Sequence, residues 1–334
     1  MKVILLLFMP FFIIGCQPDS QIGETAKVNL ILDTDIGPDY DDVGAMALMH
    51  ALADSGEVNI IATISSNMDQ YTVPCIEVIN SYFNRPNILV GATKGKGVSL
   101  TTWHKEQKWP VVLTQKYKHA TRETAQAPDA VAMYRKILSL ATDNSVTICS
   151  IGFFTNLRNL LQSTGDGYSD LNGEELVARK VKRLVSMAGE FPESKKGEFN
   201  VKKDAISAAH VMKHWPTEIL LSGFEIGDAI ITGKPTSEMP VHRSPIKDTY
   251  RLSLPQDNPY GRNSWDQTAV LVAIKGYEPY YTIERGTMVV NPVTGANKWT
   301  EDEQGKHAYL VKEMPDEQIA VLLENYMMHQ PVKK

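Results

Sequence analysis

Apolar runs of strand length alternate with helix-like patterns from residue 28 onward. The strand-like runs are "VNLIL" (28–32), "NIIATIS" (59–65), "NILVG" (87–91), "SVTICSIG" (145–152), "VKRLVSMAG" (181–189) and "TEILLSG" (217–223). Apolar residues three and four positions apart predict helices between them, at 41–53, from about 72, and at 128–141, 155–163 and 204–213. Continuous apolar strands that alternate with helices are typical of a mostly parallel central sheet with helices on both faces. We therefore predict an α/β domain over residues 28–334.

The end of the chain shows a different pattern. Residues 281–311 are typical of strands joined by turns, with a hairpin at about 292–298. Residues 314–328 carry apolar side chains at helical intervals and predict a closing helix that faces the core.

The first sixteen residues are unlike the rest of the chain. Met1 and Lys2 precede an apolar run from Val3 to Gly15, which resembles a secretory signal and is short for a membrane-spanning helix. The run ends in "IIGC", which resembles the lipobox of bacterial lipoproteins, in which the cysteine, here Cys16, carries the lipid. We expect a signal peptide at 1–16, a tether at 17–27 and a protein held by lipid alone to the bacterial cell envelope. The alternative is an ordinary cleaved signal with an incidental cysteine.

Composition narrows the class of protein further. The chain is 43% hydrophobic with a formal net charge of -5, and no basic stripe accompanies its aromatic residues, which argues against a nucleic-acid partner. Cys75 and Cys149 lie in a helix-like and a strand-like context. Buried thiols are therefore favoured over a disulfide.

Polar residues gather where the predicted strands end. Asp33 and Asp35 follow the first strand, Ser66 and Asn67 the second, and Glu190 the fifth. Ligand sites on parallel sheets lie beyond the carboxyl ends of the strands. The sequence therefore predicts a site at this edge of the sheet.

Five aspartates stand within ten positions at the first of these strand ends, at residues 33, 35, 39, 41 and 42. One or two of them could cap the following helix. Like charges this close repel by on the order of a kcal/mol or more per pair, so five indicate a bound cation. Calcium or magnesium fits oxygen ligands, and no His/Cys spacing suggests zinc.

The segment "LDTDIGPDYDDVGAMAL" is similar to the N-terminal signature of the inosine-uridine nucleoside hydrolase family, Asp-x-Asp-Pro-Gly-x-Asp-Asp-Ala, with two extra residues in the turn. The resemblance implies that Asp35, Asp41 and Asp42 bind a catalytic Ca²⁺. It also implies that Asp35 is the general base for the attacking water. The insertion leaves Asp39 as an alternative to Asp41.

Further segments match the family in order, from about residue 30 to 274. "ISSN" implies a sugar contact by Asn67, and "SIGFFTNL" implies a calcium ligand in the backbone carbonyl of Ile151. "GEFN" implies that Glu198 and Asn200 hold ribose hydroxyls. "NSWDQTAVLVAI" implies that Asp266 is the last metal aspartate.

Two positions depart from the family pattern. Trp265 stands where the inosine-uridine branch has a histidine that protonates the leaving base; it could stack on a purine or simply pack in the core. The family asparagine before "EFN" falls near Pro192, so either Glu193 or Ser194 takes its place or no residue does. His104 and His242 are candidate acids only by availability, and surface histidines are the favoured interpretation. Trp103 and Trp109 could form an aromatic wall or anchor their loop.

The sequence thus predicts calcium-dependent hydrolysis of the N-glycosidic bond of a ribonucleoside, which releases base and ribose. The alternative is a non-catalytic nucleoside- or sugar-binding lipoprotein on the same fold. A phosphohydrolase of the haloacid-dehalogenase type is disfavoured because Gly37 stands where its loop needs a threonine. Relatives of the family are often dimers or tetramers, so the resemblance is compatible with a homo-oligomer.

Overall fold

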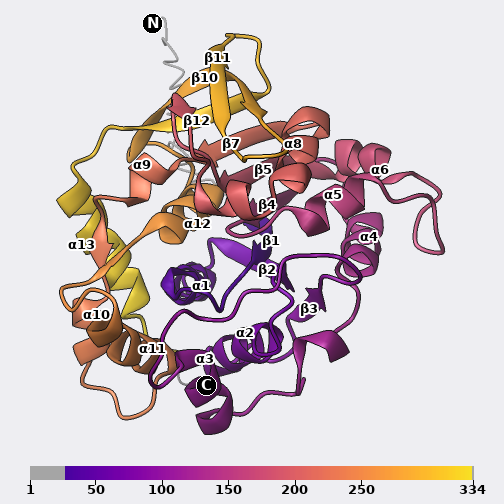
Figure 1. The fold of residues 1–334 in the computed structure, drawn as a ribbon. Helices are drawn as coiled ribbons and strands as arrows, with labels where there is room; N and C mark the ends of the chain where they lie inside the picture. The colour runs from indigo at the N-terminus through magenta and orange to yellow at the C-terminus, as the bar shows by residue number, and fades with distance from the viewer. Residues whose placement is uncertain (1–26, 333–334) are drawn as a thin grey trace, which may run out of the picture.

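The computed structural model describes residues 27–332 (Figure 1). The predicted signal peptide, its Cys16 and residues 17–26 of the tether lie outside the described residues. Within residues 27–332, no helix has the length and apolar character needed to cross a membrane.

A ten-stranded sheet runs through the molecule in the order β3-β2-β1-β4-β5-β7-β12-β10-β11-β6. Its strands are β1 (Val28–Thr34), β2 (Val58–Ser65), β3 (Leu89–Ala92), β4 (Val146–Ser150), β5 (Val181–Met187), β6 (Glu193–Ser194), β7 (Glu218–Ser222), β10 (Tyr281–Val290), β11 (Asn297–Glu301) and β12 (His307–Lys312). The strands from β3 to β12 in this order pair in parallel. The last three add antiparallel pairs, including the predicted hairpin between β10 and β11. The mostly parallel sheet is confirmed.

Helices cover both faces of this sheet, as predicted (Figure 1). One core contains residues of α1 (Asp41–Asp54), α2 (Thr72–Tyr82), α3 (Trp109–Lys116), α11 (Pro245–Ser253), α12 (Trp265–Lys275) and the closing helix α13 (Asp316–Met327). The core on the other face contains residues of α4 (Ala130–Leu140), α5 (Thr155–Leu161), α6 (Gly173–Lys180) and α8 (Ala205–His214). Helix α1 is buried nearly all round because it packs between the sheet, α12 and α13.

The two cysteines of the described chain are buried free thiols, one on α2 and one on β4, as expected. Burial raises the pKa of both Cys75 and Cys149. Neither thiol is therefore poised to react as a thiolate.

The segment from 164 to 175 is largely exposed and is held to the core through Arg135. Arg135 is nearly fully buried and donates to the Asp166 carboxylate and to the backbone carbonyls of Ser169 and Leu171. The segment then ends in a capping box, in which Asn172 starts α6. The Asn-x-x-Glu spacing in "NGEE" was the available signal for that helix start.

Candidate active site

A pocket of about 200 Å³ opens beyond the carboxyl ends of β1, β4 and β5. Five carboxylates, four aromatic rings and one arginine are among the side chains that line it. The lining residues are Asp35, Asp39, Asp41, Trp103, Ile151, Met187, Glu198, Phe199, Asn200, Phe224, Arg262, Trp265 and Asp266. Six of the residues that the sequence singled out for metal or substrate are therefore brought together with Asp41: Asp35, Ile151, Glu198, Asn200, Trp265 and Asp266.

Asp35 lies just after β1, which is two residues longer than predicted, so that Asp33 is still part of the strand. Gly152, in the loop after β4, presses directly against Asp35: a Cβ at position 152 would lie 2.5 Å from the Asp35 backbone nitrogen. Only glycine fits this approach. Sequence matching found Asp35 itself, and Gly152 explains how the neighbouring loop can stay so close.

Asp42 and Asp266 complete a buried anionic group with Asp35. One oxygen of Asp42 accepts a hydrogen bond from the Thr34 hydroxyl, and its Oδ2 is buried with no partner. Asp266 lies in the first turn of α12 and is 5% exposed. Burial, followed by repulsion from neighbouring carboxylates, raises the pKa of Asp35, Asp42 and Asp266 well above the usual range.

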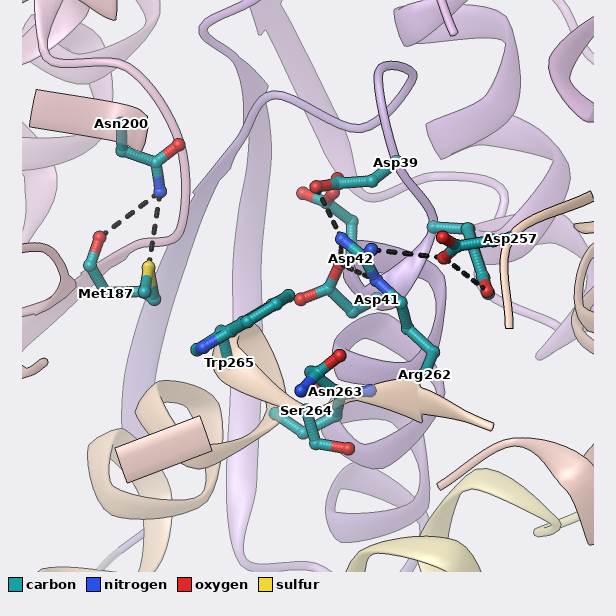
Figure 2. Close-up of polar contacts among 12 residues, drawn as sticks. Asp39, Asp41, Asp42, Met187, Asn200, Asp257, Arg262, Asn263, Ser264 and Trp265 are labelled. Atoms are coloured by element: carbon teal, nitrogen blue, oxygen red, sulfur yellow. Dashed lines mark hydrogen bonds and ion pairs between the residues drawn. The ribbon is translucent and has the colours of Figure 1, made fainter. Parts of the chain in front are cut away.

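Arg262, on the short strand β9 (Arg262–Asn263) that pairs with β8 (Ile231–Thr232), reaches into this acidic group (Figure 2). Its Nη2 donates to Asp39 Oδ2 at 2.8 Å and to Asp41 Oδ1 at 3.0 Å, and its Nη1 donates to Asp257 Oδ2 at 3.3 Å. Asp39 and Asp41, the two alternatives for one metal position, are thus both paired with the same guanidinium. Sequence reasoning missed Arg262 because no motif marks it.

The oxygen donors suit a hard cation. Within residues 27–332, no three His, Cys, Asp or Glu side chains stand ready around one point as metal ligands. The unpartnered Oδ2 of Asp42 and the raised pKa of Asp35 and Asp266 nevertheless mark negative charge that the arginine does not offset. Carboxylates that repel one another turn apart unless a cation holds them together, so this uncompensated charge argues for a bound cation. The donor set therefore fits Ca²⁺ in chemistry.

Glu198 and Asn200 line the pocket from the start of α7 (Phe199–Lys203). The Glu198 carboxylate caps this helix, because it accepts from the backbone N–H groups of Asn200 at 2.8 Å and Val201 at 3.2 Å. Burial raises the pKa of Glu198 to about 7. The Asn200 amide donates to the Met187 carbonyl at 3.3 Å (Figure 2). Both side chains are held by backbone contacts at the edge of the pocket.

The structure corrects the sugar contact expected of Asn67. This side chain is fully buried, and it does not line the pocket. Its Nδ2 donates to the carbonyl oxygens of Asp35 and Leu100, and its Oδ1 accepts from the N–H groups of Asp69 and Leu100. All of its hydrogen-bonding capacity is used by backbone, so Asn67 braces the loops around Asp35.

The residues considered as replacements near Pro192 do not reach the pocket either. Glu193 and Ser194 form β6, which pairs with β11 at the edge of the sheet. The Ser194 hydroxyl donates to Glu190 at 2.8 Å. Neither residue lines the pocket.

The four aromatic side chains of the lining, Trp103, Phe199, Phe224 and Trp265, are called the aromatic wall, and its five carboxylates are called the anionic wall. Trp265 lines the pocket, stacks on Phe224 with ring centroids 5.3 Å apart and donates its indole N–H to the Phe224 carbonyl at 2.9 Å. Trp103 is 45% exposed and lines the pocket, whereas Trp109 is fully buried in the core. Trp103 thus belongs to the aromatic wall, and Trp109 is the anchor of its loop.

No histidine of the described chain lines the pocket. His242 is exposed, as expected, but His104 is only 2% exposed, so its assignment as a surface histidine was wrong. Its ring lies between Tyr40 and Trp103, with centroids 5.8 Å from each. Burial lowers the pKa of His104, which favours the neutral ring.

Several solved structures share this fold but are distant in sequence. An inosine-guanosine nucleoside hydrolase is 18% identical, with a TM-score of 0.70, over 91% of this chain and 99% of its own. An inosine-uridine preferring nucleoside hydrolase from Bacillus anthracis is 14% identical, with a TM-score of 0.65, over 91% and 99%. A purine-preferring ribonucleoside hydrolase from Gardnerella vaginalis is 16% identical, with a TM-score of 0.65, over 90% and 96%.

A comparison with curated protein sequences gives no match. The family model described as inosine-uridine preferring nucleoside hydrolase matches residues 30–319, which include both walls of the pocket. The predicted N-glycosyl hydrolase is therefore confirmed: the chain belongs to the inosine-uridine preferring nucleoside hydrolase family and is a nucleoside ribohydrolase.

Proposed function

We propose that the protein hydrolyses the N-glycosidic bond of a ribonucleoside in a calcium-dependent reaction, with Asp35 as the base. The observation that carries this proposal is that the carboxylates of the anionic wall and the rings of the aromatic wall line one and the same pocket. A polyhydroxylated sugar suits the first wall and a flat base suits the second. The large faces of Trp103 and Trp265 favour a purine.

Asp35, Asp42, Asp266 and the backbone of Ile151 are the proposed holders of Ca²⁺, with Asp41 engaged by Arg262. Calcium, when bound, supplies positive charge that offsets the carboxylates and lowers the pKa of a coordinated water. Asp42 Oδ2 is a carboxylate oxygen of this group that is buried without a partner, and such a cation would satisfy it.

Side chains of the protein accept the proton of the water and position the sugar and the base. Asp35 accepts the proton of the attacking water, which bonds to the anomeric carbon of the ribose. Glu198 and Asn200, held by the backbone of α7 and by Met187, fix the ribose hydroxyls in place. Trp265 contacts the base from the aromatic wall. The rigid supports of these side chains keep the sugar aligned with Asp35.

Free ribose released from a panel of purine and pyrimidine nucleosides, with and without a chelator, tests the proposal. Release that calcium restores after chelation supports it. Ribose release that persists unchanged in chelator would refute the calcium dependence.

We also propose that the lipid on Cys16 holds the enzyme in the bacterial cell envelope. The "IIGC" segment supports this localisation. Metabolic labelling with a fatty acid should mark the full-length protein and leave Cys16→Ser unlabelled. A protein that is secreted without label would identify the segment as an ordinary signal peptide.

A further inference from the structure

Arg262 lies where the anionic and aromatic walls of the pocket meet. Its guanidinium hydrogen-bonds to Asp39 and Asp41 on one wall. Its Cζ atom lies 5.0 Å from the ring centroid of Trp265 and 5.5 Å from that of Trp103, both of the aromatic wall. Arg262 is therefore in contact with residues of both walls at once.

A nucleoside that places its sugar at the carboxylates and its base at the tryptophans must place the bond between them at this boundary. We propose that Arg262 is a catalytic residue that stabilises the negative charge on the leaving base. This inference rests on the proposed function. It assigns a side chain to the departure of the base, a step that a histidine assists in the inosine-uridine branch, whereas no histidine lines the described pocket.

The hydrogen bonds of Arg262 leave one donor available for a ligand. A guanidinium has five N–H groups. Four of them donate, two to Asp41, one to Asp39 and one to Asp257. The remaining N–H, on Nη1, has no acceptor among residues 27–332. It is the donor that we assign to the base.

The surroundings of Arg262 also hold it in a fixed orientation. Its side chain is 9% exposed, and three aspartates grip its edge while Tyr40 lies 5.2 Å from its Cζ atom. These carboxylates reduce the positive electrostatic potential of the guanidinium. They also fix its orientation, so it does not have to reorient during the reaction as a free side chain would. A preorganised donor in a largely dry site is effective at stabilising charge that develops in a transition state.

The step balances without any further reactant. The bond between the anomeric carbon and the base nitrogen breaks, and its electron pair stays on the base. The water oxygen bonds to the anomeric carbon, and the water proton passes to Asp35. The free Nη1–H of Arg262 donates to the anionic base, which later takes a proton from solvent. Arg262 keeps its own proton throughout, because a guanidinium does not titrate in proteins.

Two substrates with different leaving groups test this role. Inosine has a poor leaving group that needs stabilisation, whereas 4-nitrophenyl β-D-ribofuranoside releases a nitrophenolate that needs little. We would measure kcat/KM for both with the full-length wild type, Arg262→Gln and Arg262→Lys. Arg243→Gln is the matched control, since this exposed arginine also faces an aromatic ring, that of Tyr117 at 5.1 Å, away from the pocket.

Arg262→Gln should lower kcat/KM for inosine about a hundredfold more than for the nitrophenyl riboside, which is the effect typical of losing one preorganised donor. Arg262→Lys should also lower kcat/KM selectively for inosine, but only about tenfold. Lysine keeps the positive charge but lacks the planar set of N–H donors of a guanidinium. If the glutamine variant does not fold, the lysine variant still tests the inference. Arg243→Gln should match the wild type.

Equal losses for both substrates would overturn the inference, since damage to Asp35 or to the metal site slows both reactions alike. Unchanged inosine hydrolysis would overturn it as well, and so would a wild type that cleaves inosine but not the nitrophenyl riboside. A wild type that cleaves neither the nitrophenyl riboside nor any nucleoside would instead refute the proposed function, and the inference with it.

Discussion

The side-chain amide of Asn67 donates to the backbone carbonyl oxygen of Asp35 at 3.1 Å. The same amide group ties the loop at Leu100 to this position, at 2.8 Å. The proposed base is thus supported from outside the pocket, by a residue that does not line it.

Asn67→Ala should therefore lower kcat more than it raises KM, since it frees the backbone of Asp35 but removes no sugar contact. It should also destabilise the fold by about 1 to 3 kcal/mol, because buried backbone groups lose their partner. Steady-state kinetics and urea denaturation check both effects. A large rise in KM with kcat unchanged would instead place Asn67 on the substrate.

Asp35→Asn should reduce kcat by more than the hundredfold to ten-thousandfold that general bases typically contribute, because Asp35 is also a proposed metal ligand. The same change removes one charge from a buried like-charged group, so the free energy of unfolding in chelator should rise. Single-turnover ribose release and urea denaturation are the measurements. A variant with near wild-type kcat would show that another carboxylate is the general base.

Asp42→Asn and Asp266→Asn should each abolish the rise in Tm that calcium gives the wild type. Both side chains are buried and carry charge that Arg262 does not offset. Glu238→Gln, which changes an exposed carboxylate paired with Lys234, is the control and should keep the full calcium response. The measurement is the Tm of each variant with and without calcium. A wild-type rise in Tm in both aspartate variants would refute this metal site.

The stability of the chelated protein should fall as pH rises from about 5 to about 8. Burial raises the pKa of Asp33, Asp39 and Glu198 to about 7 in the folded state, above their ordinary values. Between the ordinary and the raised pKa the folded state binds more protons than the unfolded state, so the free energy of unfolding decreases with pH. Urea denaturation across this range measures the slope. Calcium should restore stability at the upper end, and a flat or rising curve in chelator would contradict the prediction.

Arg135→Met should destabilise the fold by about 2 to 3 kcal/mol through lost charge-assisted hydrogen bonds, without changing kcat. The Arg135 side chain is 2% exposed and holds the 164–171 loop, none of whose residues lines the pocket. Arg179→Met, in an exposed pair with Asp143, is the control and should have no measurable effect. Urea denaturation and proteolysis of the loop are the measurements, and equal stability of both variants would contradict this role.

The sequence predicted the sheet well because its parallel strands are buried on both faces and read as continuous apolar runs. The short elements α9 (Phe224–Gly227), α10 (Lys234–Glu238) and β9 escaped prediction, since their stability comes from tertiary contacts rather than local pattern. The antiparallel hairpin was expected, but its partner β6 has only two residues and no strand signal.

The residues of the candidate site also fall into those that a local motif predicted and those that only the folded structure reveals. Asp35, Glu198 and Asp266 follow short motifs, and those motifs placed them correctly at the pocket. Arg262 and Phe224 have no motif; they reach the pocket only because the folded chain carries their short elements there. Asn67 shows the opposite case, because a matching motif fixed its position near Asp35 but could not reveal that backbone groups already occupy its amide.

The pairing of β6 with β11 has a consequence for the design of shortened proteins. Ser194 and Glu193 pair with Asn297 and Lys298, more than a hundred residues away. Asn297 also donates to the backbone carbonyl of Glu190, so the stretch leading to Glu198 is fastened to the C-terminal hairpin at two points. Truncation before residue 297 would unfasten that stretch, and a minimal catalytic fragment must therefore retain the hairpin even though it contributes no side chain to the pocket.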